Sequence, residues 1–141
     1  MHKIIKYFLI IFISLTINVF AKENFFQEAK ILFDQGKIEE SKFLFQRNIV
    51  FNPKDSKSYL ILAKIFEKEE NEFEEEKNIN TTLLLEPNNE EAMFMLIDIK
   101  LEKSDISKAE ELREKFKIIC NSLCSKIESI DERLSNINAK N

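Results

Sequence analysis

Residues 53–87 read PKDSKSYLILAKIFEKEENEFEEEKNINTTLLLEP, a stretch bounded by the chain's two prolines, 34 positions apart. The same offset relates residues throughout the chain, which indicates an internal repeat. Aligned sets at this offset are Phe25, Tyr59 and Met93; Ala29, Ala63 and Ile97; Glu28, Leu62 and Leu96; Leu32 and Phe66; Phe45 and Ile79; and Phe51 and Leu85. The period therefore predicts an array of similar units.

The composition excludes several classes of protein. The 141 residues include one glycine, two prolines and no tryptophan, and 25 acidic residues outnumber 21 basic ones, for a formal charge of -4. A single glycine cannot build a phosphate-binding loop, and so few turn-forming residues cannot connect a β-sandwich or barrel. An acidic chain with scattered lysines is also a poor nucleic-acid binder, because phosphate contacts need a basic face. We therefore expect an all-α protein with no nucleic-acid partner.

Local signals divide each unit into two helices. Gly36 and Asn71 stand where a left-handed residue would end the first helix of a unit. Pro53 and Pro87 should end the second helices, because proline disfavours helical geometry in the residue before it.

These residues resemble a tetratricopeptide repeat (TPR): an aromatic and a small residue on the first helix, a turn, a second helix and a closing proline. The resemblance implies an α-α superhelix of about three helix pairs with a C-terminal capping helix. The repeats are expected at 22–55, 56–89 and 90–119, the third degenerate, and the capping helix at 120–138. Glu28 departs from the pattern at a position that is normally apolar, and Lys100 and Arg113 depart from it where aromatic residues are preferred.

Residues 1–21 have the order of a secretory signal peptide. Lys3 and Lys6 precede the apolar run 7–17, and Val19 and Ala21 fit the small-residue positions before a cleavage site. The alternative is a permanent membrane anchor, but an 11-residue run spans about 16 Å as a helix, roughly half of the hydrocarbon core. We expect cleavage after Ala21, a periplasmic or secreted protein, and no stable membrane anchor in the mature chain.

The segment after the repeats carries one apolar stripe at helical spacing. Its members are Leu123, Ile127, Ile130, Leu134 and Ile137. The residues Ser125-x-x-Glu128 form a possible capping box that would start this helix near Ser125. The helix is interpreted as an end cap on the third repeat, with a dimerising helix as the alternative.

Cys120 and Cys124 are the only cysteines. Export to an oxidising compartment favours a disulfide, and a bend at 121–122 would bring the two sulfurs together. Two buried thiols or a redox-active pair remain alternatives, although the Cys-x-x-Cys spacing of redox enzymes is absent. Two cysteines cannot complete a tetrahedral metal site without histidine, so no metal site is predicted.

Residues 67–77 contain seven glutamates and two lysines. This run is interpreted as a solvated turn, with a calcium-binding or basic-partner patch as the alternative; a calcium loop would need a glycine, which the run lacks. No nucleophile or general base stands out, so neither an enzyme nor a cofactor is predicted.

The TPR resemblance implies a concave groove lined by the first helix of each repeat. The groove residues it gives are Phe26, Lys30, Phe33, Leu60, Lys64, Phe94, Asp98 and Leu101. The apolar members predict an interface for an apolar peptide or helix, with Lys30 and Lys64 pairing an acidic group on it. The alternative is that the cap helix or a second copy of the chain covers them.

The function expected from the sequence is that of a non-catalytic protein-interaction scaffold in the bacterial periplasm, with a protein or peptide as its partner. The alternative is a structural subunit of a larger envelope assembly that oligomerises through the groove or the cap helix. The oligomeric state stays open.

Overall fold

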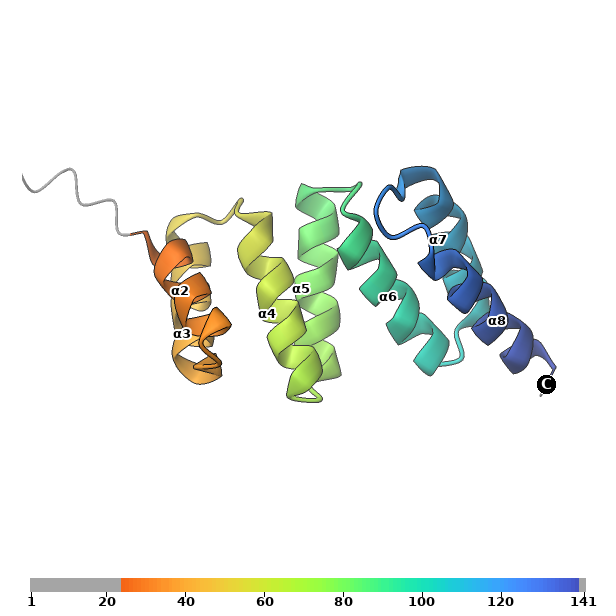
Figure 1. The fold of residues 1–141 in the computed structure, drawn as a ribbon, viewed down its shortest axis with the longest axis horizontal. Helices are drawn as coiled ribbons and strands as arrows, with labels where there is room; N and C mark the ends of the chain where they lie inside the picture. Colours follow the sequence, from red (N-terminus) through yellow and green to blue (C-terminus); the bar gives the residue numbers. More distant parts are fainter. Residues whose placement is uncertain (1–23, 140–141) are drawn as a thin grey trace, which may run out of the picture.

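Residues 24–139 are described by a computed structural model, and all regular elements among them are α-helices. The expected signal peptide, residues 1–21, lies outside the described residues. The helices are α2 (Phe25–Asp34), α3 (Ile38–Phe51), α4 (Ser56–Lys68), α5 (Glu72–Leu85), α6 (Glu90–Glu102), α7 (Ile106–Ile119) and α8 (Lys126–Asn138). They stand side by side in an elongated row (Figure 1). α2 and α3, α4 and α5, and α6 and α7 pack as pairs, and α8 packs on α6 and α7.

The turns inside the pairs repeat one backbone geometry every 34 residues. Gly36, Glu70 and Ser104 have positive φ angles of 76°, 54° and 56°. After each of them, the next backbone N–H donates to a carbonyl five residues earlier, as from Asn71 to Phe66 at 2.9 Å. This bond satisfies a carbonyl that a helix end leaves unpaired. The repeat seen in the sequence is thus also a repeat of backbone conformation.

The prediction that Asn71 adopts the left-handed conformation is wrong. Its φ is -96°, and it is the N-cap of α5, where its side chain accepts a hydrogen bond from the Glu74 N–H at 3.3 Å. Glu70 takes the left-handed position instead. Asparagine is favoured at both kinds of position, but here the capping bond satisfies an otherwise unpaired N–H group of α5.

The second helices of the first two pairs end as the prolines predict. α3 ends at Phe51 and α5 at Leu85, each two residues before a proline. The backbone then turns into the first helix of the next pair within four residues. These short connections hold successive pairs in contact.

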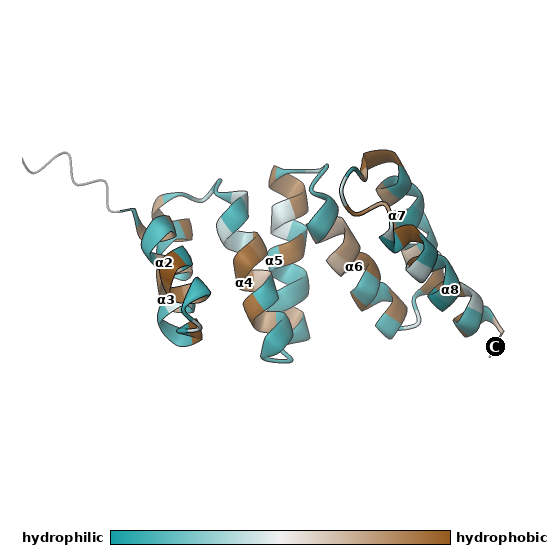
Figure 2. Cartoon of the chain, in the orientation of Figure 1, coloured by the Kyte–Doolittle hydropathy of each residue, from teal (hydrophilic) through white to brown (hydrophobic). Residues whose placement is uncertain are grey.

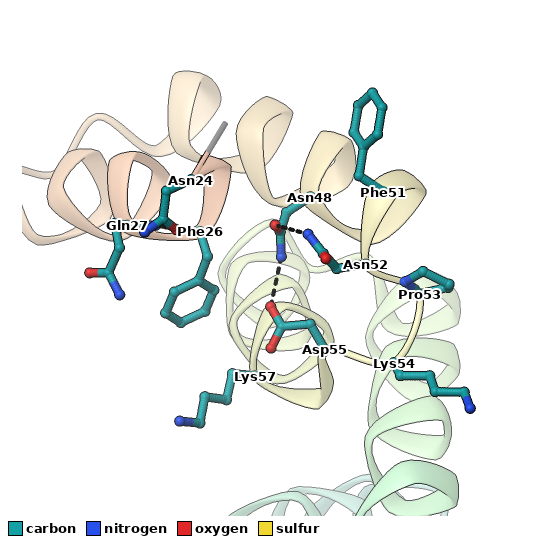
Figure 3. Close-up of a pocket in the computed structure, with 10 residues that line it drawn as sticks. All are labelled: Asn24, Phe26, Gln27, Asn48, Phe51, Asn52, Pro53, Lys54, Asp55 and Lys57. Atoms are coloured by element: carbon teal, nitrogen blue, oxygen red, sulfur yellow. Dashed lines mark hydrogen bonds between the residues drawn. The ribbon is translucent and has the colours of Figure 1, made fainter. Parts of the chain in front are cut away.

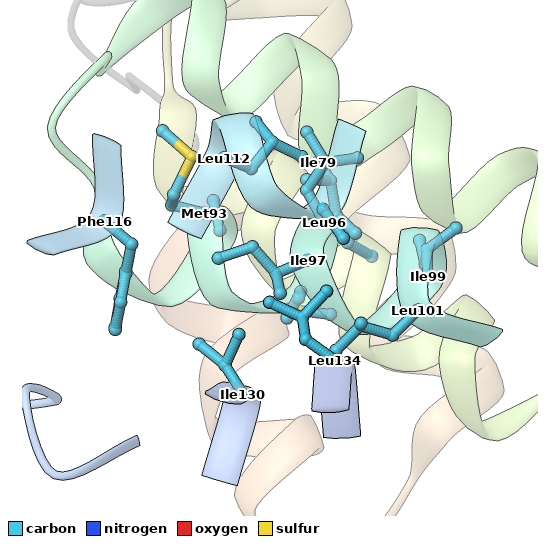
Figure 4. Packing of buried hydrophobic residues seen from close by; sticks show 14 residues of the cluster. Ile79, Met93, Leu96, Ile97, Ile99, Leu101, Leu112, Phe116, Ile130 and Leu134 are labelled. Atoms are coloured by element: carbon cyan, nitrogen blue, oxygen red, sulfur yellow. The ribbon is translucent and has the colours of Figure 1, made fainter. Parts of the chain in front are cut away.

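The core forms two clusters of buried side chains. The first joins Ala29 and Phe45 of the first pair to α4. The second, larger cluster surrounds α6 and extends to α8 (Figure 4). Ala29, Ala63 and Ile97, which the 34-residue offset aligns, are all fully buried. Each pair therefore buries part of its apolar surface only against its neighbour, as in other repeat arrays.

The cap helix begins close to the expected residue but without the expected capping box. α8 starts at Lys126, and the side chain of Ser125 makes no capping hydrogen bond. Ser125 is already helical, with φ -61° and ψ -19°. An N-cap serine needs an extended backbone to reach back to the helix N–H groups, so the box cannot close. The apolar stripe nevertheless packs inward, with Ile130 and Leu134 buried.

Two departures from the TPR pattern are salt bridges between helices. Lys100 of α6 pairs with Glu76 of α5. Arg113 of α7 contacts Asp131 of α8 through two bonds, Nε–Oδ1 at 2.7 Å and Nη2–Oδ2 at 2.5 Å. Charged pairs thus occupy positions where aromatic packing was expected.

Candidate functional site

The first helices of the pairs lie along the near face of the array in the view of Figure 1, with α3 and α7 behind α2 and α8. Hydrophobic residues occupy the middle of α4 between hydrophilic ends (Figure 2). We call the expected groove residues on this side the first-helix face. Its members are Phe26, Lys30, Phe33, Leu60, Lys64, Phe94 and Asp98.

Phe26 and Phe33 of α2 are half-buried rather than fully exposed, whereas Phe25 of the same helix is buried. The Phe26 ring meets the Phe45 ring edge-on, with centroids 5.7 Å apart. The Lys68 ammonium of α4 lies 5.6 Å from the centroid of the Phe33 ring. Each ring therefore keeps part of its surface free while the rest is packed on the first two pairs.

Lys30 and Lys64 already have acidic partners within the chain. Lys30 pairs with Asp34 at 2.9 Å, one helical turn away. Lys64 pairs with Glu91 at 2.7 Å, which joins α4 to α6. An acidic group on a partner would have to compete with these two carboxylates.

The third pair's share of the first-helix face is engaged by α8. Arg133 of α8 pairs with Asp98, and the Lys126 ammonium lies 5.4 Å from the Phe94 ring centroid. Leu101, which the sequence also assigned to the groove, is only 3% exposed and belongs to the core cluster that includes Leu134. The cap helix therefore covers this end, and the open part of the face is formed by α2 and α4.

The pKa of Asp98 is affected by the packing of α8 over this end of the face. Burial raises the pKa of the Asp98 carboxyl above its ordinary value, although Arg133 opposes the shift. A carboxylate loses hydration under α8, and the single guanidinium does not fully compensate for that loss.

A hollow of about 760 Å³ opens at the upper end of the first-helix face, between α2 and the loop from α3 to α4 (Figure 3). The buried Asn48 amide donates to Asp55 at 2.7 Å and accepts from the Asn52 amide at 3.0 Å. These bonds fix the loop below the hollow. The Phe26 and Lys57 side chains point to the same side of this loop in Figure 3, so the hollow continues the open part of the face.

The cysteines lie in a loop that a distant carboxylate anchors. The sulfurs of Cys120 and Cys124 are at disulfide-bonding distance, and their Cα atoms are 5.2 Å apart. Glu90 accepts backbone N–H bonds from Asn121 at 2.8 Å and from Leu123 at 3.1 Å. The hydrogen bond from Asn121 contributes most, and together these bonds lower the pKa of Glu90 to about 2. Nothing in the sequence connects Glu90 with residues more than 30 positions away, so this anchor was missed.

Part of the acidic run forms a hollow rather than only a solvated turn. The hollow, of about 270 Å³, is lined by Glu67, Glu70, Glu72, Glu75, Met95, Asp98, Ile99 and Glu102. Glu75 takes the position that Ser41 and Ala109, both buried, hold in the other pairs. Burial and then the neighbouring carboxylates, Glu67 first, raise the pKa of Glu75 to about 7. In the sequence, the 34-residue alignment of Glu75 with Ser41 and Ala109 is the signal that could have shown this glutamate to lie at an inward-facing position.

No group of three or more His, Cys, Asp or Glu side chains within residues 24–139 is arranged to hold a metal ion. None of the helices in the same part of the chain is both long and apolar enough to cross a membrane. What the first-helix face offers chemically is apolar and aromatic contact flanked by lysines, which suits non-covalent binding.

No protein-family model matches the chain, and no curated protein sequence matches it.

Solved structures do match its fold. The Yersinia enterocolitica type III secretion chaperone SycD, in complex with a peptide of the translocator YopD, matches with a TM-score of 0.68 and 17% identity over 84% of this chain and 92% of that chain. The second TPR domain of human RPAP3, in complex with an HSP70 peptide, matches with a TM-score of 0.64 and 18% identity over 81% and 92%. The TPR2B domain of yeast Sti1, in its complex with pHsp70, matches with a TM-score of 0.66 and 16% identity over 84% of this chain and 97% of that chain. The all-α fold of tetratricopeptide repeats, predicted from the sequence, is thus confirmed.

Proposed function

We propose that the chain is a non-catalytic protein-interaction adaptor that holds a peptide or helix of a partner protein against the open part of the first-helix face. The observation that carries this proposal is the set of half-buried side chains Phe26, Phe33 and Leu60 on neighbouring helices α2 and α4. The SycD and RPAP3 structures of the same fold contain bound peptides, which supports this use of the array.

The partner segment is apolar in this proposal. Phe26 and Phe33 of α2 and Leu60 of α4 present apolar surface, and burying such surface is the main favourable term in association. The lysines contribute less, because Lys30 and Lys64 are already ion-paired. Specificity for an acidic group would then be secondary to apolar contact.

We also propose that the adaptor acts in the bacterial periplasm. The support is the order of basic, apolar and small residues in 1–21. Intact mass spectrometry of the protein recovered from cell fractions tests this part. A periplasmic species that begins at Lys22 is expected, and a species that retains Met1 to Ala21 contradicts it.

Peptide selection tests the binding site. The protein, exported from cells that express the full chain, is immobilised and presented with a displayed library of linear random peptides. Enriched peptides should carry adjacent apolar residues and should lose binding to a variant with Leu60→Glu and Lys64→Glu. The milder Leu60→Ala variant keeps the test decisive if the double variant unfolds.

A matched control carries Leu84→Glu and Lys115→Glu, the same residue changes on the second helices α5 and α7. Leu84 is 80% exposed, so this control should fold and bind normally. Peptides that bind the first-helix-face variants and the control equally well would show that the binding surface lies outside the first-helix face.

A further inference from the structure

The first pair leaves uncovered a surface that the other two pairs bury. Ile31 of α2 is 57% exposed, whereas its equivalents Ile65 and Ile99 are 0% and 2% exposed. Leu44 of α3 is half-buried, whereas its equivalent in the third pair, Leu112, is buried. Isoleucine and leucine residues at equivalent positions are thus exposed or half-buried in the first pair and buried in later pairs.

The neighbouring pairs show what covers this surface elsewhere. Leu62, Ile65 and Phe66 of α4 pack with Phe45 of α3, and Ala29 of α2 joins the same cluster. On the next pair, Leu96 and Ile99 of α6 share a cluster with Ile79 of α5. In both cases the second helix of the preceding pair contributes the covering side chain. The equivalent residues of α2 are Glu28, Ile31 and Leu32, and no described helix precedes α2.

The uncovered surface is hollowed and apolar at its base. A hollow of about 610 Å³ is lined by Glu28, Leu32, Lys37, Glu39, Glu40, Phe43 and Leu44. Phe43 is 62% exposed, while the corresponding positions of the other pairs carry the exposed polar residues Lys77 and Glu111. A large apolar residue points outward at this position in the first pair only. We call this surface, together with Ile31, the open end.

The rim of the open end is acidic. Glu28 and Glu40 form no ion pair within residues 24–139, and Glu39 pairs only with Lys42 at 3.1 Å. Lys37 is the one cation lining the hollow. A second copy of the chain that docked through its own open end would bring an equally acidic rim to this surface, and like charges brought together oppose association. Charge complementarity therefore favours a basic partner.

We propose that the open end docks an amphipathic helix of a partner protein, with an apolar stripe flanked by Lys or Arg, on the side of α2 that α3 covers on α4 and reaching across the hollow to Phe43 of α3. The stripe would cover Ile31, Leu32 and Phe43, and the basic flanks would meet Glu28 and Glu40. Helix-in-groove recognition of this kind reads apolar residues at i, i+3, i+4 and i+7. This site is separate from the first-helix face and does not depend on the function proposed for that face.

A library of helices displayed on a rigid two-helix scaffold, with the outer face randomised, is the probe for this site. The exported protein is the target. Selected helices should share an apolar stripe with flanking Lys or Arg, and their affinity should fall as salt is added. A variant with Ile31→Lys and Phe43→Lys should bind them at least about tenfold more weakly, because it replaces the apolar base by charges that repel a basic helix.

The matched control carries Val50→Lys and Leu84→Lys, which place two lysines at exposed aliphatic positions of the second helices α3 and α5, outside the open end. It should bind the selected helices like the unaltered protein, and so should the Leu60→Ala variant of the first-helix face. Both lysine variants alter exposed side chains only, and circular dichroism should show an unchanged helical signal and melting temperature.

Three outcomes would overturn the proposal. The first is a selection that yields no helices, or helices without basic flanks. The second is binding that survives the Ile31→Lys and Phe43→Lys changes. The third is a dimer of the unaltered protein in light scattering that these two changes dissociate, because a second copy would then occupy the open end.

Discussion

The Arg113 guanidinium of α7 forms two parallel bonds to the Asp131 carboxylate of α8, at 2.7 and 2.5 Å. This pair lies beside the apolar stripe of α8 and fixes the cap helix on the last helix pair. The TPR pattern prefers an aromatic residue at position 113, so this chain has a charged pair where that pattern has aromatic packing. Two parallel bonds between a guanidinium and a carboxylate fix the relative orientation of the two side chains as well as stabilising their contact.

We expect Arg113→Gln to lower the free energy of unfolding by about 1 kcal/mol, because a two-bond pair at a partly exposed site is lost. Urea denaturation followed by circular dichroism measures the change. Lys108→Gln, which removes the exposed pair between Lys108 and Glu111 within α7, should have a smaller effect. Equal effects of the two substitutions would show that the Arg113 pair does not hold α8.

The acidic hollow predicts a pH dependence of stability. The pKa of Glu75 is about 7 in the folded chain, above its ordinary value of 4.5, so the folded state binds more protons than the unfolded state between these pH values. Stability should therefore fall as pH rises through this window. Facing Glu75 are Glu67, Glu70, Glu72, Asp98 and Glu102, with no cation among the residues that line the hollow.

Glu75→Gln should remove this contribution. Urea midpoints of the two proteins are measured from pH 4 to pH 8, and the variant should gain stability over the unaltered protein as pH rises. Glu110→Gln, an exposed change on α7, serves as the control. A constant difference between Glu75→Gln and the unaltered protein at all pH values would contradict the assignment.

Cys120 and Cys124 should be bridged in protein recovered from the periplasm, the location proposed above. Alkylation of the unfolded protein without reductant should modify neither thiol, and reduction should make both reactive. Because the closed loop is short, its loss should cost less than the ~3 kcal/mol typical of a 15-residue loop. Recovery of two alkylated thiols from unreduced periplasmic protein would rule the bridge out.

The three pairs should unfold as one unit. Ala63 is fully buried in the larger cluster, so Ala63→Glu buries an unpaired charge at a cost of several kcal/mol, against a total stability of ~5–15 kcal/mol. Circular dichroism should show that Ala63→Glu loses helical signal and melts at a lower temperature than the unaltered protein. Leu84→Glu at an exposed position should change neither, and native-like melting of Ala63→Glu would contradict this packing.

The sequence was sufficient for the architecture because the 34-residue offset places Ala29, Ala63 and Ile97 at the same contact. It was insufficient for contacts between unlike positions. The pairing of Asp98 with Arg133 depends on how α8 lies across α6, which no periodicity encodes. Glu28 looked anomalous because the repeat pattern assumes a preceding neighbour, and α2 has no such neighbour among the described helices.

Photo-crosslinking in cells tests whether a partner segment lies on the open part of the first-helix face. A photoreactive phenylalanine analogue is placed at position 33 of the full chain or, as control, at position 84, and crosslinked adducts are compared after irradiation. We expect a discrete protein adduct from position 33 that position 84 does not give. The same adduct from position 84 alone, or no adduct from position 33, would contradict it.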